Sequence, residues 1–173
     1  MEILNETEFD KVFALLEMSF IKDELRPYDE QKNLLKNPIY HVYVERDQNS
    51  NQLKAFIAVW DFKNFIFIDY FAVHPAFRNQ RLGEKMLKSL SRLTQKDIYL
   101  EIETPKDEMT LRRLHFYERN HFILCPFFYE QPPIARGNTP VALSLMSTKN
   151  ITQEKEFEEI QKVIYKYAYE PFL

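Results

Sequence analysis

The stretch FIFIDYFAVHPAFRNQRLGEKML, residues 65–87, decides the fold of this 173-residue chain, because its pattern changes half-way along. Residues 65–73 are β-branched, aromatic and apolar, which is typical of a strand. Over residues 80–93, leucines and a methionine recur at spacings of three and four, which predicts a helix. The segment DIYLEIE at 97–103 alternates like another strand. Strand, helix and strand in this order indicate a parallel crossover.

The same periodicities place the other elements, with a tight turn at Lys63 and Asn64 between two of the strands. We predict helices over 6–25 (capped by Asn5 or Thr7), 29–37, 108–120 and about 152–168, and strands over 39–46, 53–62, 122–129 and 140–146. Together they predict a single α/β (or α+β) domain over residues 1–173. Its central sheet is mixed but mostly antiparallel, has about seven strands and carries helices on both faces. The aromatic C-terminal helix packs on this sheet or on a second subunit, so a homodimer stays open.

Composition excludes several classes of protein. A formal net charge of -3 removes the long-range attraction to phosphate backbones, so we expect no nucleic-acid partner. Cys125 is the only cysteine, which rules out an intrachain disulfide and fits a reducing cytoplasm. The four histidines share no metal-ligand spacing, and we assign no metal. No segment has the apolar length of a membrane span, so we expect no membrane partner.

The start of the 80–93 helix concentrates positive charge around one of only two glycines in the chain. Unpaired backbone N–H groups at a helix N-terminus attract anions, and Gly83 lets a ligand approach them closely. Arg78, Arg81 and Lys85 would oppose the helix dipole if no anion were bound. The alternative is that Gly83 permits close packing of the helix on the sheet, and that the basic residues form a solvated face.

Two motifs carry a resemblance to a known family. The run Phe71-Ala72-Val73-His74-Pro75, followed by Arg78-Asn79-Gln80-Arg81-Leu82-Gly83, resembles the acetyl-coenzyme A signature of the GNAT (Gcn5-related N-acetyltransferase) superfamily. The run Phe116-Tyr117-Glu118-Arg119-Asn120-His121-Phe122 resembles its second signature. Arg81 and His121 each stand where the family usually has a glycine. The order of predicted elements also agrees with the family's order over nearly the whole chain.

The resemblance implies how acetyl-CoA is held. It assigns the pantetheine arm and the thioester oxygen to the backbone of the strand end Phe71, Ala72 and Val73. It assigns the diphosphate to the loop and helix start Arg78, Asn79, Gln80, Arg81, Leu82, Gly83, Glu84 and Lys85. Tyr117 matches the family tyrosine that acts as general acid, or as hydrogen-bond donor, toward the departing thiolate. The alternative for Tyr117 is a core tyrosine that packs helix on sheet.

Carboxylates are the candidates for the base that an amine acceptor requires, because an alkyl ammonium has a pKa of about 10.4. Glu101 and Glu103 alternate with Leu100 and Ile102, so both carboxylates point to one face, and Asp69 lies on the neighbouring strand. Glu103 is the first choice for base or amine anchor, since it ends its strand. The alternative is that these residues solvate an open sheet.

Acidic groups favour a cationic acceptor, such as a primary amine on a small molecule or a peptide, and Glu24, Arg26 and Tyr28 are placed to shape its entrance. The sequence therefore predicts an N-acetyltransferase in which the amine attacks acetyl-CoA directly within a ternary complex. The alternative is a coenzyme-binding or regulatory module without turnover, which the two replaced glycines motivate. Another nucleotide is disfavoured, because no Walker motif or dinucleotide fingerprint is present.

Overall fold

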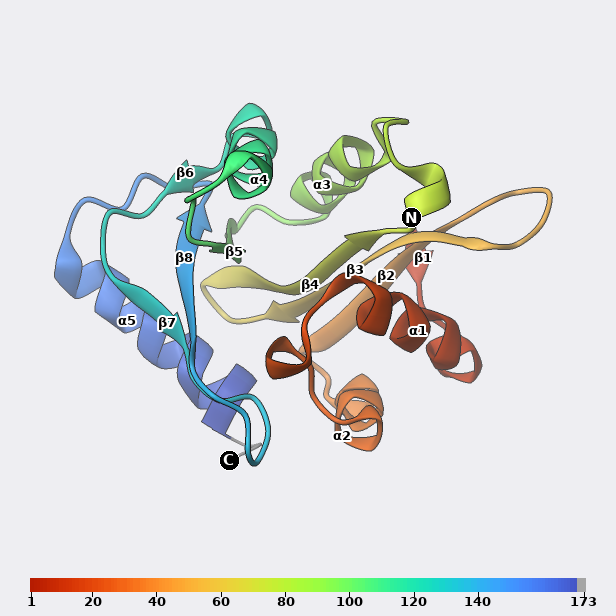
Figure 1. Cartoon of the computed structure of the whole chain (residues 1–173), viewed down its shortest axis with the longest axis horizontal. Coiled ribbons are helices and arrows are strands. Elements are labelled where there is room, and N and C mark those ends of the chain that lie inside the picture. Colours follow the sequence, from red (N-terminus) through yellow and green to blue (C-terminus); the bar gives the residue numbers. More distant parts are fainter. Residues whose placement is uncertain (171–173) are drawn as a thin grey trace.

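The computed structural model describes residues 1–170, which form one open sheet with helices on both faces (Figure 1). The strands are β1 (Glu2–Ile3), β2 (Tyr40–Arg46), β3 (Leu53–Asp61), β4 (Phe65–Val73), β5 (Asp97–Glu103), β6 (Ile123–Leu124), β7 (Tyr129–Gln131) and β8 (Val141–Ser147). Their order in the sheet is β1-β2-β3-β4-β5-β8-β6, and β7 also pairs with β8. Only β4 and β5 are parallel, which confirms the mixed, mostly antiparallel sheet.

The helices divide between the two faces of the sheet (Figure 1). Their bounds are α1 (Phe9–Ser19), α2 (Tyr28–Asn33), α3 (Leu82–Leu93), α4 (Glu108–Arg119) and α5 (Glu154–Ile164). Helices α3 and α4 cover one face, whereas α1, α2 and α5 cover the other. Short 3-10 turns occupy Glu6–Glu8, Lys22–Glu24, Leu34–Lys36 and Pro75–Phe77. A π-helical turn, Tyr165–Tyr169, follows α5 and is called the C-terminal turn below.

Two predicted elements are corrected. The helix expected over 6–25 ends at Ser19, because Phe20 is extended and packs its ring edge-on against Tyr70. The strand expected over 122–129 breaks into β6 and β7 on either side of Pro126, which has no N–H for a strand ladder. With β1 added at the edge, the sheet has eight strands, in agreement with the predicted size of about seven. Among residues 1–170, no helix has the length and apolar character of a membrane crossing.

The C-terminal helix packs on its own sheet. Phe157 of α5 and Ile164, Ala168 and Tyr169 at its end are buried in the same core as α1. This packing brings the C-terminal turn beside β5, although the two are far apart in the sequence. The homodimer left open by the sequence stays a prediction.

Strands β4 and β5 pair over only half of their length. The parallel register runs from Phe65 opposite Asp97 to Ile68 opposite Leu100 and then stops. The next residue of β4, Asp69, is the extra residue of a β-bulge, because Ala58 of β3 faces Tyr70 while Val59 faces Ile68. A bulge bends its strand and ends regular pairing. The two strands therefore part beyond this point and leave a gap in the middle of the sheet.

Candidate functional site

A cleft of about 60 Å³ lies where β4 and β5 part. Four carboxylates line it: Glu24, Asp69, Glu101 and Glu103. Ile102, between the two glutamates of β5, is buried with Leu100 against α3 and α4. Leu100 and Ile102 thus point to one face of the sheet, as the alternation in the sequence predicts. The predicted acidic residues lie together at the cleft.

Asp69 and Glu103 form ion pairs, whereas none is seen for Glu24 and Glu101 among the described residues. Glu101 is the more deeply buried of these two. Its Oε1 accepts hydrogen bonds from the hydroxyls of Tyr129 and Tyr169, and its Oε2 accepts one from Tyr169 at 2.6 Å. Burial raises the pKa of Glu101 to about 7, although the two tyrosine hydrogen bonds act to lower it. A carboxyl group with this pKa exchanges a proton readily at neutral pH.

Asp69 is held in a buried ion pair instead. The Arg26 guanidinium donates from Nη1 to Oδ2 at 2.8 Å and from Nη2 to Oδ1 at 3.0 Å, and both side chains are almost fully buried. Tyr40 donates a third hydrogen bond, at 2.8 Å. Burial alone would lower the pKa of Arg26, but the charge of Asp69 raises it above its ordinary value. Asp69 therefore anchors the bulge of β4 rather than offering a free base.

Glu103 and Glu24 form the more open side of the cleft. Glu103 accepts a hydrogen bond from Arg113 of α4, and both side chains are substantially exposed. Burial and then the charge of Glu103 raise the pKa of Glu24. Arg113, which also lines the cleft, acts in the opposite direction and lowers the pKa of Glu24.

The segment between β7 and β8 closes over the Lys22–Glu24 corner. Gln131 donates to the Asp23 carbonyl at 3.3 Å, and Asn138 donates to the Lys22 carbonyl at 3.4 Å. Gln131 and Ile134 also line the cleft. Tyr28 lies elsewhere: its ring packs on those of Phe9 and Phe13.

The N-terminus of α3 adopts the backbone shape of an anion site. Arg81, its N-cap, is left-handed at φ 56, and Asn79 is left-handed at φ 63. The first intrahelical bond runs from the Lys85 N–H to the Arg81 carbonyl at 3.0 Å, so the amides of the first turn face outward. A Cβ on Gly83 would lie 3.1 Å from the Phe116 ring. Close packing of α3 on α4 therefore accounts for this glycine.

Arg78, Lys85 and Lys88 near α3 have partners within the protein. Arg78 donates from Nε to the Val73 carbonyl at 3.2 Å. Lys85 pairs with Glu45 at 2.6 Å, and that carboxylate also binds the N-terminal amine. Glu84 pairs with Lys88 one turn on. The backbone amides and the exposed Arg81 side chain, rather than the lysine side chains, are thus the groups placed to meet an anion.

Tyr117 lies on the opposite face from Glu101. It is buried on α4, with its ring between those of Phe116 and Phe122. Burial raises the pKa of Tyr117 to about 12. Its neighbour at the helix end, His121, is left-handed at φ 70.

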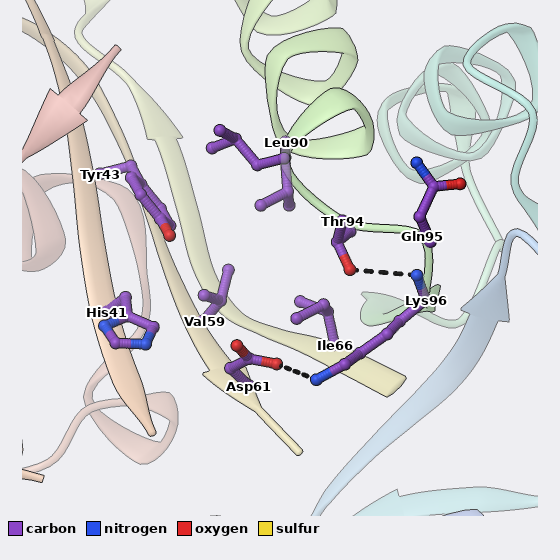
Figure 2. A pocket seen from close by; sticks show the side chains of 10 residues that line it. His41, Tyr43, Val59, Asp61, Ile66, Leu90, Thr94, Gln95 and Lys96 are labelled. Atoms are coloured by element: carbon purple, nitrogen blue, oxygen red, sulfur yellow. Dashed lines mark hydrogen bonds and ion pairs between the residues drawn. The ribbon is translucent and has the colours of Figure 1, made fainter. Parts of the chain in front are cut away.

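A larger hollow, of about 320 Å³, lies between strands β2 to β4 and the C-terminal end of α3 (Figure 2). Its ionic groups satisfy each other: Lys96 pairs with Asp61 at 2.6 Å and donates to the Phe62 carbonyl at 2.7 Å. It lies at the far end of α3 from Arg81 and contains none of the predicted site residues. The smaller cleft, which gathers the predicted carboxylates, is therefore the candidate site.

A family model agrees with this architecture. The model described as "Acetyltransferase (GNAT) domain" matches residues 38–124, from the start of β2 to the end of β6. The chain belongs to the GNAT acetyltransferase family. The resemblance seen in the two sequence motifs is thereby confirmed at the level of the family. The GNAT match includes α3, α4 and the parted strands, and it ends before β7, β8 and α5.

Known proteins support the same assignment. The solved structure titled "Putative acetyltransferase from GNAT family" from Bacteroides thetaiotaomicron has a TM-score of 0.85 and 30% identity, over 94% of this chain and 92% of that chain. "Putative acetyltransferase YjbC" of Bacillus subtilis (strain 168) is 36% identical over 105 residues, which are 58% of this chain and 50% of that protein. The chain therefore spans about half the length of this curated relative.

A more distant structure shares only the fold. An aminoglycoside 6'-N-acetyltransferase complexed with coenzyme A has a TM-score of 0.61 at 17% identity, over 88% of this chain and all of that chain.

Sequence reasoning missed the side chains that act on the carboxylates. Tyr129 and Tyr169 come from β7 and the C-terminal turn, and Arg113 comes from α4. Nothing in their local pattern separates them from the other tyrosines and arginines. Arg26 had one signal, an arginine in the corner beside Pro27, but its partner Asp69 is 43 residues away.

Proposed function

We propose that this GNAT protein transfers an acetyl group from acetyl-CoA to a primary amine on a small molecule or peptide, by direct attack within a ternary complex. The observation that carries the proposal is the parting of β4 and β5 beside Glu101. It exposes strand backbone on one side and a proton-accepting carboxylate on the other. Family membership supplies the donor class.

The backbone fits a thioester carrier. Beyond Ile68, β4 pairs only with β3, so alternate N–H and C=O groups of Phe71, Ala72 and Val73 have no strand partner toward β5, and of these the Val73 carbonyl accepts a hydrogen bond from Arg78. Such groups suit the amides of a pantetheine arm, and one N–H suits the thioester oxygen. The open strand end is therefore the proposed seat of the acyl carrier.

The diphosphate seat is proposed at the start of α3. A left-handed residue followed by helical ones turns successive N–H groups into an anion-binding concavity, and Arg81 followed by Leu82 and Gly83 has this shape. Arg78, Asn79, Gln80 and Glu84 complete the loop. Lys85, already paired with Glu45, contributes charge at a distance rather than a direct contact.

Glu101 is the proposed base. Acetyl-CoA supplies an activated acyl group, and the amine nitrogen forms the new C–N bond while the C–S bond breaks. The alkylammonium acceptor gives one proton to a Glu101 oxygen before the attack, and the proton that the nitrogen loses after the attack passes to the departing sulfur, which leaves as the thiol. The thiolate takes a hydrogen bond from Tyr117, the role implied by the family motif. Full proton transfer from a phenol of pKa about 12 to a thiolate of ordinary pKa about 8.5 would cost about 5 kcal/mol. Tyr117 therefore acts as donor rather than acid.

The acceptor is proposed to be cationic and slender. A cleft of about 60 Å³ with Glu24 and Glu103 at its open side favours an alkylammonium group. Glu103, already paired with Arg113, fits the role of anchor better than that of base. Asp69, paired with Arg26, holds the bulge at which β4 and β5 part.

The retained backbone shape removes the observation that motivated a module without turnover. The alternative was motivated by Arg81 and His121 at positions where glycine is usual. Both residues nevertheless adopt left-handed conformations, at φ 56 and φ 70. The chain path that the glycines normally permit is thus maintained, at a cost of about 1–2 kcal/mol per residue.

The test measures binding and turnover separately. Acetyl-CoA should raise the melting temperature of the purified protein, whereas acetate should not. A panel of primary amines, including polyamines, aminoglycosides and lysine peptides, is then screened for thiol release with acetylated product confirmed by mass spectrometry. Stabilisation without release for any amine would favour the coenzyme-binding module. No stabilisation by acetyl-CoA would overturn both readings.

A further inference from the structure

Glu101 is held by residues that lie outside the GNAT family match, which ends at residue 124. Tyr129 stands on β7, and Tyr169 ends the C-terminal turn. The Tyr169 hydroxyl lies 2.8 Å from Oε1 and 2.6 Å from Oε2 of Glu101, and the Tyr129 hydroxyl donates to Oε1. Both carboxylate oxygens therefore meet a phenol that the family match does not include.

Both phenols are donors in this contact. Burial, and next the charge of Glu101, raise the pKa of Tyr129 and of Tyr169 well above the ordinary tyrosine value. The two hydroxyls therefore keep their protons at any pH where the protein works. Hydrogen bonds donated to a carboxylate favour its ionised form and fix its orientation.

The turn that carries Tyr169 is anchored on both sides of the cleft. Arg26 donates from Nη2 to the carbonyl of Ala168, at 2.7 Å, while it binds Asp69 of β4. Tyr165 at the start of the turn donates to the carbonyl of Glu130 on β7. One turn thus connects the bulge of β4 with the base on β5.

We propose that the C-terminal turn is part of the catalytic site, with Tyr169 and Tyr129 as positioning residues that keep the Glu101 carboxylate ionised and oriented toward the acceptor amine. The proposal rests on the proposed function, because it needs Glu101 to be the base. A role in the site gives the aromatic C-terminal segment a reason to pack onto this sheet beside β5.

Other charged and titratable groups also surround Glu101. They come from β4, the 24–26 corner, β5, α4 and the C-terminal turn: Asp69, Tyr70, Glu24, Arg26, Glu103, Arg113 and Tyr165. A Tyr169→Phe change keeps the ring and leaves every one of these groups in place. A change in the titration of Glu101 would therefore report the lost hydrogen bond.

The experiment titrates Glu101 directly by carboxyl ¹³C NMR of glutamate-labelled protein, with the signal assigned from Glu101→Gln. Tyr169→Phe should raise the midpoint by about one pH unit, the scale of one hydrogen bond to a charged group. Tyr129→Phe should move it in the same direction. Tyr165→Phe, which loses a hydrogen bond of the same turn without touching Glu101, is the matched control and should leave the midpoint in place. Thermal melts verify that each variant is folded.

An unchanged midpoint in both Tyr169→Phe and Tyr129→Phe would overturn the proposal, as would an equal shift in Tyr165→Phe. Because the titration needs no acetyl-CoA, it gives a result even if turnover is never found, which separates its failure from that of the proposed function. With any amine from the panel that the wild type acetylates, the acid limb of kcat/KM should move by the same amount. A moved NMR midpoint with an unmoved acid limb would refute the positioning of a base.

Discussion

Replacing Arg26 by methionine should destabilise the protein more than any other single change at the cleft. The Arg26 side chain is 0% exposed and that of Asp69 is 2% exposed, so neither charge is solvated by water. Methionine fills much of the space but leaves the Asp69 carboxylate with one remaining donor among residues 1–170, the Tyr40 hydroxyl. A buried charge left without its partner costs about 3–5 kcal/mol.

The assay is urea unfolding at pH 7, followed by the fluorescence of the single tryptophan, Trp60, which is buried in the sheet. For a chain of this length, a loss of 3–5 kcal/mol corresponds to a melting temperature lower by about 6–20 °C. The double variant Arg26→Met with Asp69→Asn should lose less than the sum of the two single variants, because the orphaned charge disappears.

Lys88→Met is the control, since it removes the exposed pair of Lys88 with Glu84 and should cost less than about 0.5 kcal/mol. The reasoning that this pair holds the bulge would be refuted if Arg26→Met lowered the free energy of unfolding by less than about 1 kcal/mol. It would also be refuted if the losses of the two single variants simply added in the double variant.

Three further changes test the site and its backbone. The pKa of Glu101 is raised from 4.5 to about 7 in the folded protein, so the free energy of unfolding falls by up to about 3 kcal/mol as the pH rises between these values. In thermal melts, Glu101→Gln should therefore gain stability relative to wild type from pH 5 to pH 8. A difference that stays constant with pH would contradict the raised pKa. Arg81 has a left-handed backbone, so Arg81→Gly should be more stable than Arg81→Ala by about 1 kcal/mol in urea unfolding. Lys88, on the exposed face of α3, is the control: there the alanine variant should be the more stable of the two. Tyr117→Phe should lower kcat substantially while acetyl-CoA still raises the melting temperature, because only the thiolate donor is lost; an unchanged kcat would remove Tyr117 from the mechanism.

Much of the fold follows from local patterns that a sequence displays. The change of period between 65–73 and 80–93 predicts β4 and α3, and the alternation in DIYLEIE predicts which face Glu101 and Glu103 share. Element ends were less accessible. The helix predicted over 6–25 ends at Ser19 because Phe20 turns to contact Tyr70, a residue on a strand 50 positions later.

The sequence by itself determined the order of elements, the family motifs and the shared face of the two glutamates on β5. These depend on periodicity and spacing, which act over a few residues. Only the tertiary structure distinguished the carboxylates from one another. Two glutamates that alternate on one strand look alike in sequence, but Arg113 neutralises Glu103 while Tyr169, 68 residues away, encloses Glu101. Proton affinity depends on such neighbours and on burial, and both are set by contacts between segments distant in the chain.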